Sequence, residues 1–231
     1  MANQTSQNCI VLLSAGLDSL VSLAMAKDQG YEIQLAITVN YGQQAANQEI
    51  AYAGAICDYY KIKHQIIDIR DLMLGIKSGL LTGNIPSITE HQLNNEAITK
   101  DSASRVWVPN RNGFLINLAA MYAENNNCNW IITGFNKEEA ATFPDNSGAF
   151  IEAINQSLAY STSNQVRVIS FTQELTKLDI IDVAIKLEVP LKLVWSCYYG
   201  GAKMCGVCES CQRLQRAIKP HQQILKQISF S

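Results

Sequence analysis

Apolar and polar residues follow one another in blocks that predict strands and helices in turn along the chain. Short apolar runs of strand length cover residues 9–13, 33–41 and 64–69. Between these runs, segments 17–27 and 45–60 carry apolar residues at helical spacing. Strands that alternate with helices of this length are typical of a parallel sheet built with right-handed crossovers.

The second half of the chain resumes this alternation after one weaker segment. Across residues 70–104, Gly, Thr, Asn, Pro and Ser interrupt the apolar positions, which predicts a long loop that is either a lid or partly disordered. The remaining elements are predicted as helices at 111–124, 148–160 and 177–187, and as strands at 129–134 and 165–170. We therefore expect a doubly wound α/β domain with a parallel five-stranded sheet at 1–195, and a C-terminal appendage at 196–231 within the same compact unit.

Composition and net charge indicate which class of partner the protein binds. The chain has 231 residues, with 18 Lys and Arg against 20 Asp and Glu, so its formal charge is -2 and it lacks a basic field for a nucleic-acid backbone. The apolar run near the N-terminus is too short for a signal-peptide core or a membrane span, and no basic region precedes it. We expect a cytoplasmic protein that binds small molecules, with no direct nucleic-acid partner and no membrane partner.

The sequence SAGLDS occupies the turn between the first predicted strand and the first predicted helix. In an open parallel sheet this turn faces the ligand crevice. Ser14 and Ser19 offer hydroxyls, Gly16 permits positive φ or a close backbone approach, and the helix start presents N–H groups to an anion. A capped helix start with Ser14 or Asp18 as the cap explains the same residues, and neither the P-loop nor the dinucleotide fingerprint is present. A carboxylate beside a phosphate requires a cation, which makes Asp18 a candidate Mg²⁺ ligand.

Four of the seven cysteines form the pattern C-x7-C-x2-C-x2-C, at Cys197, Cys205, Cys208 and Cys211. Four thiolates at such short spacing can close a tetrahedral shell around one Zn²⁺, which is the composition of a structural zinc site. An iron-sulfur cluster and a redox or sulfur-carrying C-x-x-C pair are the alternatives. The other cysteines are expected to be small buried hydrophobic residues, at Cys9, Cys57 and Cys128.

Two further polar segments lie where ligand contacts are expected. In VPNRN, Asn110 could cap the following helix and Arg111 could pair with a phosphate or carboxylate. A solvated arginine is the alternative, although a cation in the first turn opposes the helix dipole. The loop FNKEEAATFPDNS follows the fourth predicted strand, where an acidic loop is either simply solvated or part of the ligand site.

Taken in order, SAGLDS, YGQ, VPNRN, ITGFN with FPD, and SCYYGGAKMCGVCESC resemble the motifs of the 7-cyano-7-deazaguanine synthase (QueC) family. SAGLDS is similar to the S-G-G-x-D-S pyrophosphate loop of the N-type ATP pyrophosphatases, or PP-loop ATPases, whose fold is adenine nucleotide alpha hydrolase-like. The chain departs from the family pattern at Ala15, where the family has Gly, and at KEEAATFPDNS, where many members read closer to D-x-S-G-Y-P-D-C-R.

The resemblance implies a homodimeric ligase that uses ATP and Mg²⁺, and holds one Zn²⁺ per chain in a C-terminal knob. Its substrates would be 7-carboxy-7-deazaguanine and ammonia, and its product 7-cyano-7-deazaguanine, formed through an adenylated carboxylate and an amide. Adenylation suits this chemistry because a carboxylate is a poor electrophile that needs a leaving group. No nucleophilic residue is required, because positioning and charge stabilisation suffice.

The resemblance also implies roles for individual residues. The catalytic group would be Asp18, Arg111 and Lys203. The residues that contact ATP would be Leu13, Ser14, Ala15, Gly16, Leu17, Asp18, Ser19, Val39, Tyr41 and Gly134. Those that contact the deazaguanine would be Asn110, Arg111, Asn112, Asn136, Glu139, Phe143 and Asp145, and the zinc ligands would be Cys197, Cys205, Cys208 and Cys211.

Three other functions remain open from the sequence. A related ligase could join the activated carboxy-deazaguanine to another amine, for instance on a protein. A tRNA-thiolating adenylase could use the cysteines for sulfur transfer, although no basic RNA-binding stretch is present. A zinc-binding interaction module with a decayed nucleotide site is the non-catalytic alternative.

Overall fold

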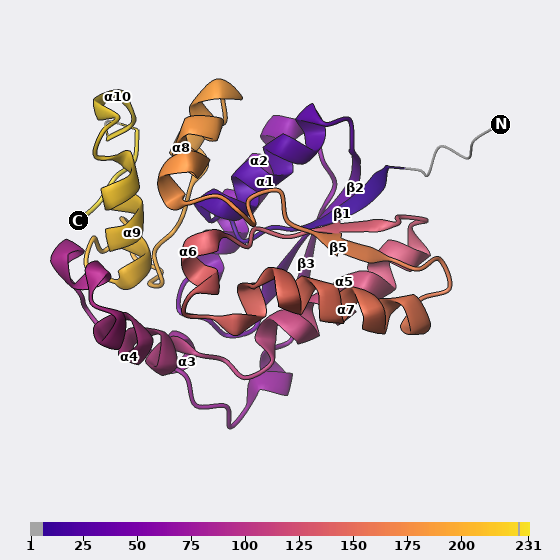
Figure 1. Ribbon diagram of the computed structural model, residues 1–231, viewed down its shortest axis with the longest axis horizontal. Coiled ribbons are helices and arrows are strands. Elements are labelled where there is room, and N and C mark those ends of the chain that lie inside the picture. The colour runs from indigo at the N-terminus through magenta and orange to yellow at the C-terminus, as the bar shows by residue number, and fades with distance from the viewer. Residues whose placement is uncertain (1–6, 226) are drawn as a thin grey trace.

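A parallel five-stranded sheet forms the centre of the computed structural model, which describes residues 7–225 and 227–231 (Figure 1). Its strands are β1 (Asn8–Leu12), β2 (Glu32–Asn40), β3 (His64–Asp68), β4 (Trp130–Ile132) and β5 (Arg167–Ile169). The strand order is β3-β2-β1-β4-β5, and every neighbouring pair is parallel. The predicted doubly wound parallel sheet is therefore confirmed.

The strand order reverses direction between β1 and β4, which pair in the register Cys9↔Trp130 to Val11↔Ile132. Two helices, α1 (Leu17–Asp28) and α2 (Ala46–Tyr60), cover one face of the sheet, and α5 (Arg111–Asn125) and α7 (Gly148–Ser161) cover the other (Figure 1). Helix α8 (Lys177–Lys186) packs against α1. In sheets of this kind the ligand crevice opens beside the reversal, at the carboxyl ends of the strands.

The two central strands are buried on both faces. Ile10, Ile131 and Ile132 are fully buried, and complete burial of one such side chain contributes about 2 kcal/mol. A strand that is covered on both faces has a continuous apolar sequence, and for this reason the apolar run at residues 9–13 correctly predicts a strand. The three scattered cysteines are buried as predicted, at Cys9, Cys57 and Cys128.

The loop predicted over residues 70–104 is wrong in part, because helices interrupt this segment. The structure has η1 (Arg70–Met73), α3 (Gly79–Thr82), η2 (Glu90–Asn94) and α4 (Glu96–Val106) here. The buried residues of α4 have helical spacing but are mostly small or polar: Thr99, Ser102, Ala103 and Val106. Hydrophobic periodicity therefore fails to reveal α4. The sequence does offer one signal, because asparagine is a favoured N-cap residue, and Asn95 caps this helix by accepting hydrogen bonds from the Ala97 and Ile98 N–H groups.

The C-terminal segment completes the hydrophobic core. It contains η4 (Leu191–Leu193), α9 (Glu209–Ile218) and α10 (Gln222–Leu225). Leu214 and Ile218 of α9 belong to the same buried cluster as the central strands. Among the residues described, no helix is long and apolar enough to cross a membrane.

Candidate functional site

A cavity of about 240 Å³ opens at the reversal point of the sheet. Its walls come from the turn after β1, the end of β2, the start of α5, the loop after β4, the first turn of α8 and the C-terminal segment. The structure brings most of the predicted site residues to this cavity: Leu13, Ser14, Gly16, Asp18, Ser19, Val39, Tyr41, Arg111, Asn112, Gly134, Glu139, Phe143 and Asp145.

Five of the residues predicted to act in catalysis or to contact ATP or the deazaguanine do not line the cavity: Ala15, Leu17, Asn110, Asn136 and Lys203. Ala15 and Leu17 are buried in the core, so their side chains point away from the cavity. Asn110 and Lys203 are exposed. Asn136 is fully buried, and its Oδ1 caps α6 (Lys137–Ala140) by accepting a hydrogen bond of 3.0 Å from the Glu139 N–H. Asn136 therefore positions Glu139 and does not itself face the cavity.

The turn after β1 is shaped by Ala15 and not, as expected, by a glycine. Gly16 has a φ of -63°, whereas Ala15 adopts the left-handed region with a φ of 60°. The Ala15 carbonyl accepts a hydrogen bond of 2.9 Å from the Trp195 N–H, which fixes this conformation. Because its methyl group is in the core, Ala15 leaves the backbone beside the cavity clear.

Helix α1 starts without a side-chain cap, so the alternative in which Ser14 or Asp18 caps this helix is wrong. The Ser14 Oγ lies 3.4 Å from the Gly16 N–H, and the Ser19 Oγ donates to the Gly16 carbonyl at 3.0 Å. The first N–H groups of a helix have no partner within the helix, and they attract anions together with the helix dipole. The turn therefore has the geometry of a phosphate site.

Gly134 holds the end of β4 against this turn. A Cβ atom at Gly134 would lie 2.4 Å from the Ser19 nitrogen, a separation that no side chain can occupy. The two loops that flank the reversal point therefore touch through their backbones, which requires glycine at this position.

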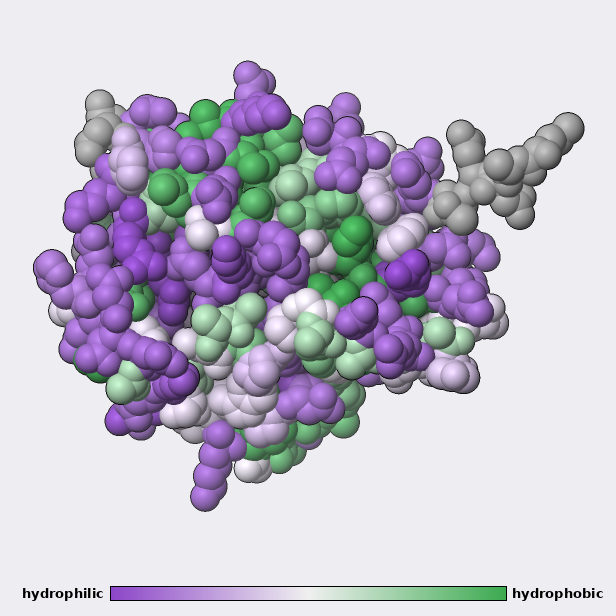
Figure 2. All heavy atoms as spheres, in the orientation of Figure 1, coloured by the Kyte–Doolittle hydropathy of each residue, from purple (hydrophilic) through white to green (hydrophobic). Residues whose placement is uncertain are grey.

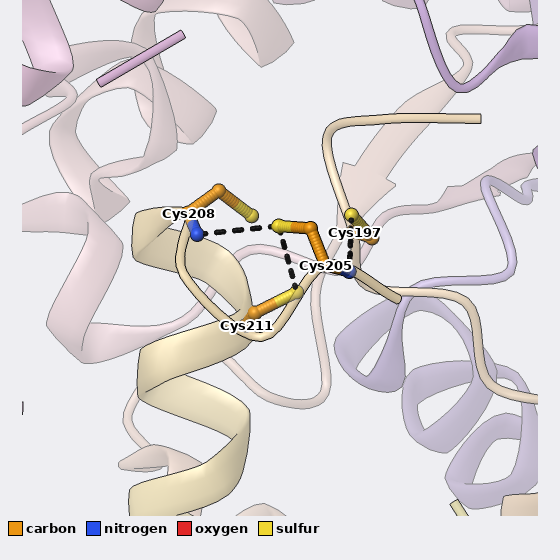
Figure 3. A group of neighbouring side chains, drawn as sticks. All are labelled: Cys197, Cys205, Cys208 and Cys211. Atoms are coloured by element: carbon orange, nitrogen blue, oxygen red, sulfur yellow. Dashed lines mark hydrogen bonds between the residues drawn. The ribbon is translucent and has the colours of Figure 1, made fainter. Parts of the chain in front are cut away.

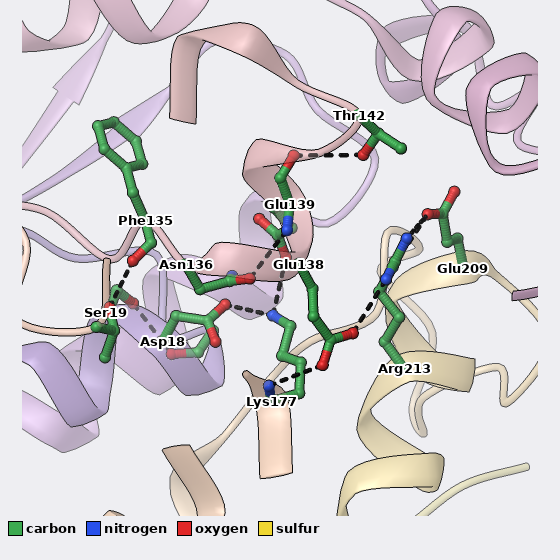
Figure 4. Close-up of polar contacts among 12 residues, drawn as sticks. Asp18, Ser19, Phe135, Asn136, Glu138, Glu139, Thr142, Lys177, Glu209 and Arg213 are labelled. Carbon is green, nitrogen blue, oxygen red and sulfur yellow. Dashed lines mark hydrogen bonds and ion pairs between the residues drawn. The ribbon is translucent and has the colours of Figure 1, made fainter. Parts of the chain in front are cut away.

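Asp18 and Glu139 share the ammonium group of Lys177 (Figure 4). The side chains are 11%, 26% and 8% exposed respectively, and Lys177 Nζ lies 2.8 Å from Glu139 Oε1. Burial alone lowers the pKa of Lys177, but attraction to the two carboxylates outweighs it and raises the pKa. Burial raises the pKa of Asp18, and Lys177 limits this rise. Asp18 Oδ1 is buried without a hydrogen-bond partner among the described residues, which fits an additional cation at this oxygen.

This charge cluster extends to the C-terminal helix α9. Glu138 accepts a hydrogen bond of 3.1 Å from Arg213, which also pairs with Glu209 (Figure 4). Glu138 accepts a second hydrogen bond, of 2.9 Å, from Arg216. The Lys177 N–H donates to the other Glu138 oxygen at 2.9 Å. The segment that carries the four cysteines is thereby tied to the wall of the cavity.

Arg111 also lines the cavity, together with Tyr41 and Asn112. Its guanidinium lies 5.8 Å from the centre of the Tyr41 ring, and it donates to the Tyr41 hydroxyl at 3.4 Å and to Asn112 Oδ1 at 3.2 Å. The Asn112 side chain donates in turn to the Asp145 carbonyl. Burial lowers the pKa of Arg111, but Tyr41 and Asp145 more than offset this and raise it. Arg111 is therefore a partly buried cation in the lining of the cavity, and the alternative of a solvated arginine is wrong.

Trp107 and Phe143 add two flat apolar surfaces to the lining. Their ring centroids are 6.2 Å apart and their planes differ by 12°. Parallel aromatic rings offer stacking surfaces to a planar heterocycle. This part of the cavity is therefore suited to a nucleobase.

The four clustered cysteines point toward one another beside α9 (Figure 3). Their Sγ atoms all lie within 4.8 Å of one another, and those of Cys205 and Cys211 are 3.9 Å apart. A Zn–S bond of about 2.3 Å places the sulfurs of a tetrahedral shell roughly 3.8 Å apart. The cluster thus has the dimensions of a site for a single metal ion.

Sequence reasoning assigned no role to several lining residues, among them Gln43, Glu49, Trp107 and Lys177. The sequence does contain a signal for Lys177, because a lysine in the first turn of a helix opposes the helix dipole, as Arg111 does in the first turn of α5. Glu49 follows the YGQ motif in the first turn of α2. Trp107 directly precedes VPNRN.

Comparisons with known proteins agree with this geometry. A family model described as queuosine biosynthesis protein QueC matches residues 8–222. A 7-cyano-7-deazaguanine synthase from Carboxydothermus hydrogenoformans is 50% identical over 211 residues, which cover 91% of this chain and 98% of that protein. One from Desulforudis audaxviator is 50% identical over 210 residues, covering 90% and 94%.

A solved structure shares the fold. The U34-tRNA thiolase NcsA from Methanococcus maripaludis, determined with its 4Fe-4S cluster, superposes with a TM-score of 0.50 and 17% identity, covering 99% of this chain and 75% of that chain. At this identity the likeness concerns the fold alone, and it agrees with the predicted PP-loop architecture.

Proposed function

Because the chain belongs to the QueC family of queuosine biosynthesis proteins, we propose that it converts 7-carboxy-7-deazaguanine and ammonia into 7-cyano-7-deazaguanine at the expense of ATP. The observation that carries this proposal is a single cavity that joins an anion site to a pair of parallel aromatic rings. An adenylating ligase needs both features side by side, since the phosphorus and the substrate carboxylate must meet.

The turn after β1 would hold the pyrophosphate of ATP. The Ser14 and Ser19 hydroxyls, the start of α1 and Lys177 supply the hydrogen bonds and positive charge. Asp18 Oδ1, which has no partner among the described residues, would hold Mg²⁺. When bound, Mg²⁺ neutralises the phosphate charge that builds up as pyrophosphate leaves.

The aromatic end of the cavity would hold the deazaguanine. Trp107 and Phe143 provide stacking surfaces, and the Asp145 carboxylate can accept hydrogen bonds from ring and amine N–H groups. Arg111 can pair with the substrate carboxylate through two parallel hydrogen bonds. This assignment orients the carboxylate before it is activated.

The reaction would consist of two activations at one carbon. A carboxylate oxygen attacks the α-phosphorus of ATP, and pyrophosphate leaves. Ammonia then attacks the carbonyl carbon, and AMP leaves with the electrons of the C–O bond. The amide oxygen attacks the α-phosphorus of a second ATP and pyrophosphate leaves, and elimination of AMP with loss of both protons from nitrogen gives the nitrile. Each step needs positioning and charge stabilisation only, which the lining supplies.

The cysteine cluster would hold one Zn²⁺ with a structural role. All four positions of a tetrahedral site are filled by protein, so no open position remains for catalysis. In a 4Fe-4S cluster an iron atom separates each thiolate from the centre, so its ligand sulfurs lie farther apart than around one ion. The observed proximity of the four Sγ atoms therefore favours zinc. A reducing cytoplasm, where we place the enzyme, keeps these thiols available.

We also expect a homodimer, formed through α7. Leu158 is the only one of its 14 residues that is buried, and Glu152 is its only charged residue. Tyr160 on α7 is 95% exposed and Met121 on the neighbouring α5 is 68% exposed. Figure 2 shows hydrophilic residues over much of this side of the molecule, with pale and apolar residues among them where α7 lies. A face with almost no charge suits a symmetric copy of itself better than a charged partner.

Sedimentation analysis of wild type and Tyr160→Glu tests this interface. A wild-type dimer that dissociates in the variant supports it. A monomeric wild type, or a variant that dimerises equally well, contradicts it.

Mass spectrometry of the product tests the proposed function. The protein is incubated with ATP, Mg²⁺, the carboxy base and ammonium chloride, and the base and AMP are quantified. The proposal requires the nitrile to form, with AMP and pyrophosphate. Amide without nitrile, or no product until another amine is supplied, would instead identify a ligase for that amine.

A further inference from the structure

Glu49 is a titratable residue in the cavity that the reaction scheme above leaves without a role. It lies in the first turn of α2 and lines the cavity. Its Oε2 accepts a hydrogen bond of 2.7 Å from Gln43 Nε2. Its Oε1 has no hydrogen-bond partner among the residues that the structure describes, although this carboxylate is only partly exposed.

The amide of Gln43 fixes the direction of this carboxylate. Gln43 is 4% exposed; its Nε2 also donates to the Val39 carbonyl at 3.1 Å, and its Oε1 accepts from the Tyr41 N–H at 3.0 Å. Both donors of the amide and its acceptor are thus occupied, and the amide cannot rotate without losing them. One oxygen of Glu49 is held in place, and the other is available to a ligand.

Tyr41 connects Glu49 to the residue assigned to the substrate carboxylate. Its backbone N–H is bonded to Gln43, and its hydroxyl accepts from Arg111 at 3.4 Å. Arg111, which would hold the substrate carboxylate, therefore contacts Tyr41 directly, and Glu49 is linked to the same residue through Gln43. Burial raises the pKa of Glu49 to about 7, with Gln43 and Arg111 acting against this rise.

We propose that Glu49 binds the ammonium ion and accepts its proton when the nucleophile is generated. The inference rests on the proposed function, and it deepens it by assigning the site of the second substrate. Nearly all ammonia is protonated at neutral pH, and ammonium has no lone pair with which to attack. An N–H bond of ammonium breaks, the proton moves to Glu49 Oε1, and the electron pair stays on nitrogen. That pair forms the C–N bond to the adenylate as AMP leaves with the electrons of the C–O bond, and the nitrogen then loses a second proton to solvent to give the neutral amide.

Glu49→Gln tests this role, because it retains the size and the acceptor for Gln43 but cannot take up the proton. The exposed Glu32, at the amino end of β2, provides the control substitution Glu32→Gln. Two steps are measured separately: pyrophosphate release from ATP and the carboxy base without ammonia, and amide formation after ammonium chloride is added.

We expect Glu49→Gln to release pyrophosphate like wild type but to form amide at least about 100-fold more slowly at pH 7. The deficit should shrink toward pH 9.5, where free ammonia is plentiful. It should also shrink at pH 7 when hydroxylamine, which is unprotonated there, replaces ammonia. Glu32→Gln should match wild type throughout.

Two results would overturn this assignment while the proposed function stands. One is a wild-type rate of amide formation by Glu49→Gln at pH 7, and the other is an equal deficit with hydroxylamine and at pH 9.5. Failure of wild type to release pyrophosphate would instead refute the proposed function, and the inference with it.

Discussion

Replacement of Lys177 by methionine should destabilise the protein strongly, because it leaves two carboxylates without their shared cation. Lys177 is 8% exposed, and its partners Asp18 and Glu139 are 11% and 26% exposed. Loss of one partner of a buried ion pair costs about 3–5 kcal/mol. Since Glu139 keeps some contact with solvent, we expect the lower end, about 3 kcal/mol, for the protein without ATP or Mg²⁺.

Urea unfolding at pH 7.5, followed by circular dichroism, measures this loss in the free energy of unfolding, provided that the slope of that free energy against urea concentration is the same in both proteins. Lys100→Met is the matched control, since Lys100 forms an exposed pair with Glu96 and its loss should cost less than about 0.5 kcal/mol. Adding Glu139→Gln to Lys177→Met removes one uncompensated charge and should restore part of the stability. A loss below about 1 kcal/mol for Lys177→Met, or no gain from the second substitution, would refute the shared-cation interpretation.

Three further predictions concern other parts of the site. Gly134→Ala should abolish pyrophosphate release while the protein still folds, because its Cβ would meet the Ser19 nitrogen at 2.4 Å; near-normal release would show that the two loops can separate. Folding raises the pKa of Glu49 from 4.5 to about 7, so the ionised carboxylate is less stable in the folded protein than in the unfolded chain. The contribution of Glu49 to the free energy of unfolding is therefore fully present below pH 4.5 and is lost as the pH rises through 7. Glu49→Gln should therefore gain up to about 3 kcal/mol relative to wild type between pH 4.5 and 8 in urea titrations, and parallel curves would contradict this. Removal of the metal by a chelator should lower the melting temperature and release one zinc per chain by elemental analysis, whereas release of iron with sulfide would exclude a zinc site.

Local signals were sufficient to predict the sheet and the turn after β1. Residues 9–13 form a continuous apolar run because both faces of β1 are covered, and SAGLDS follows this strand directly. The left-handed conformation of Ala15 was not predictable, because it depends on a hydrogen bond from Trp195, far along the chain. Such conformations are set by tertiary contacts and not by the residue itself.

Long-range partnerships explain most of what the sequence did not reveal. Lys177 is 159 positions from Asp18, so nothing in the sequence around either residue pairs them. Helix α4 buries small and polar side chains, which conceals its periodicity. The cysteine spacing predicted the four-cysteine cluster that the structure forms, but it could not indicate that Lys203 in the same segment is exposed and outside the cavity.

The fate of the substrate oxygens tests the central claim, activation by adenylation at the turn after β1, most directly. A carboxy base with oxygen-18 at both carboxylate positions is converted with unlabelled ATP, and the products are analysed by mass spectrometry. Two adenylations at one carbon predict two AMP molecules for each nitrile, each with one labelled oxygen, and unlabelled pyrophosphate. Label in pyrophosphate or in water, or a single AMP for each nitrile, would contradict the account.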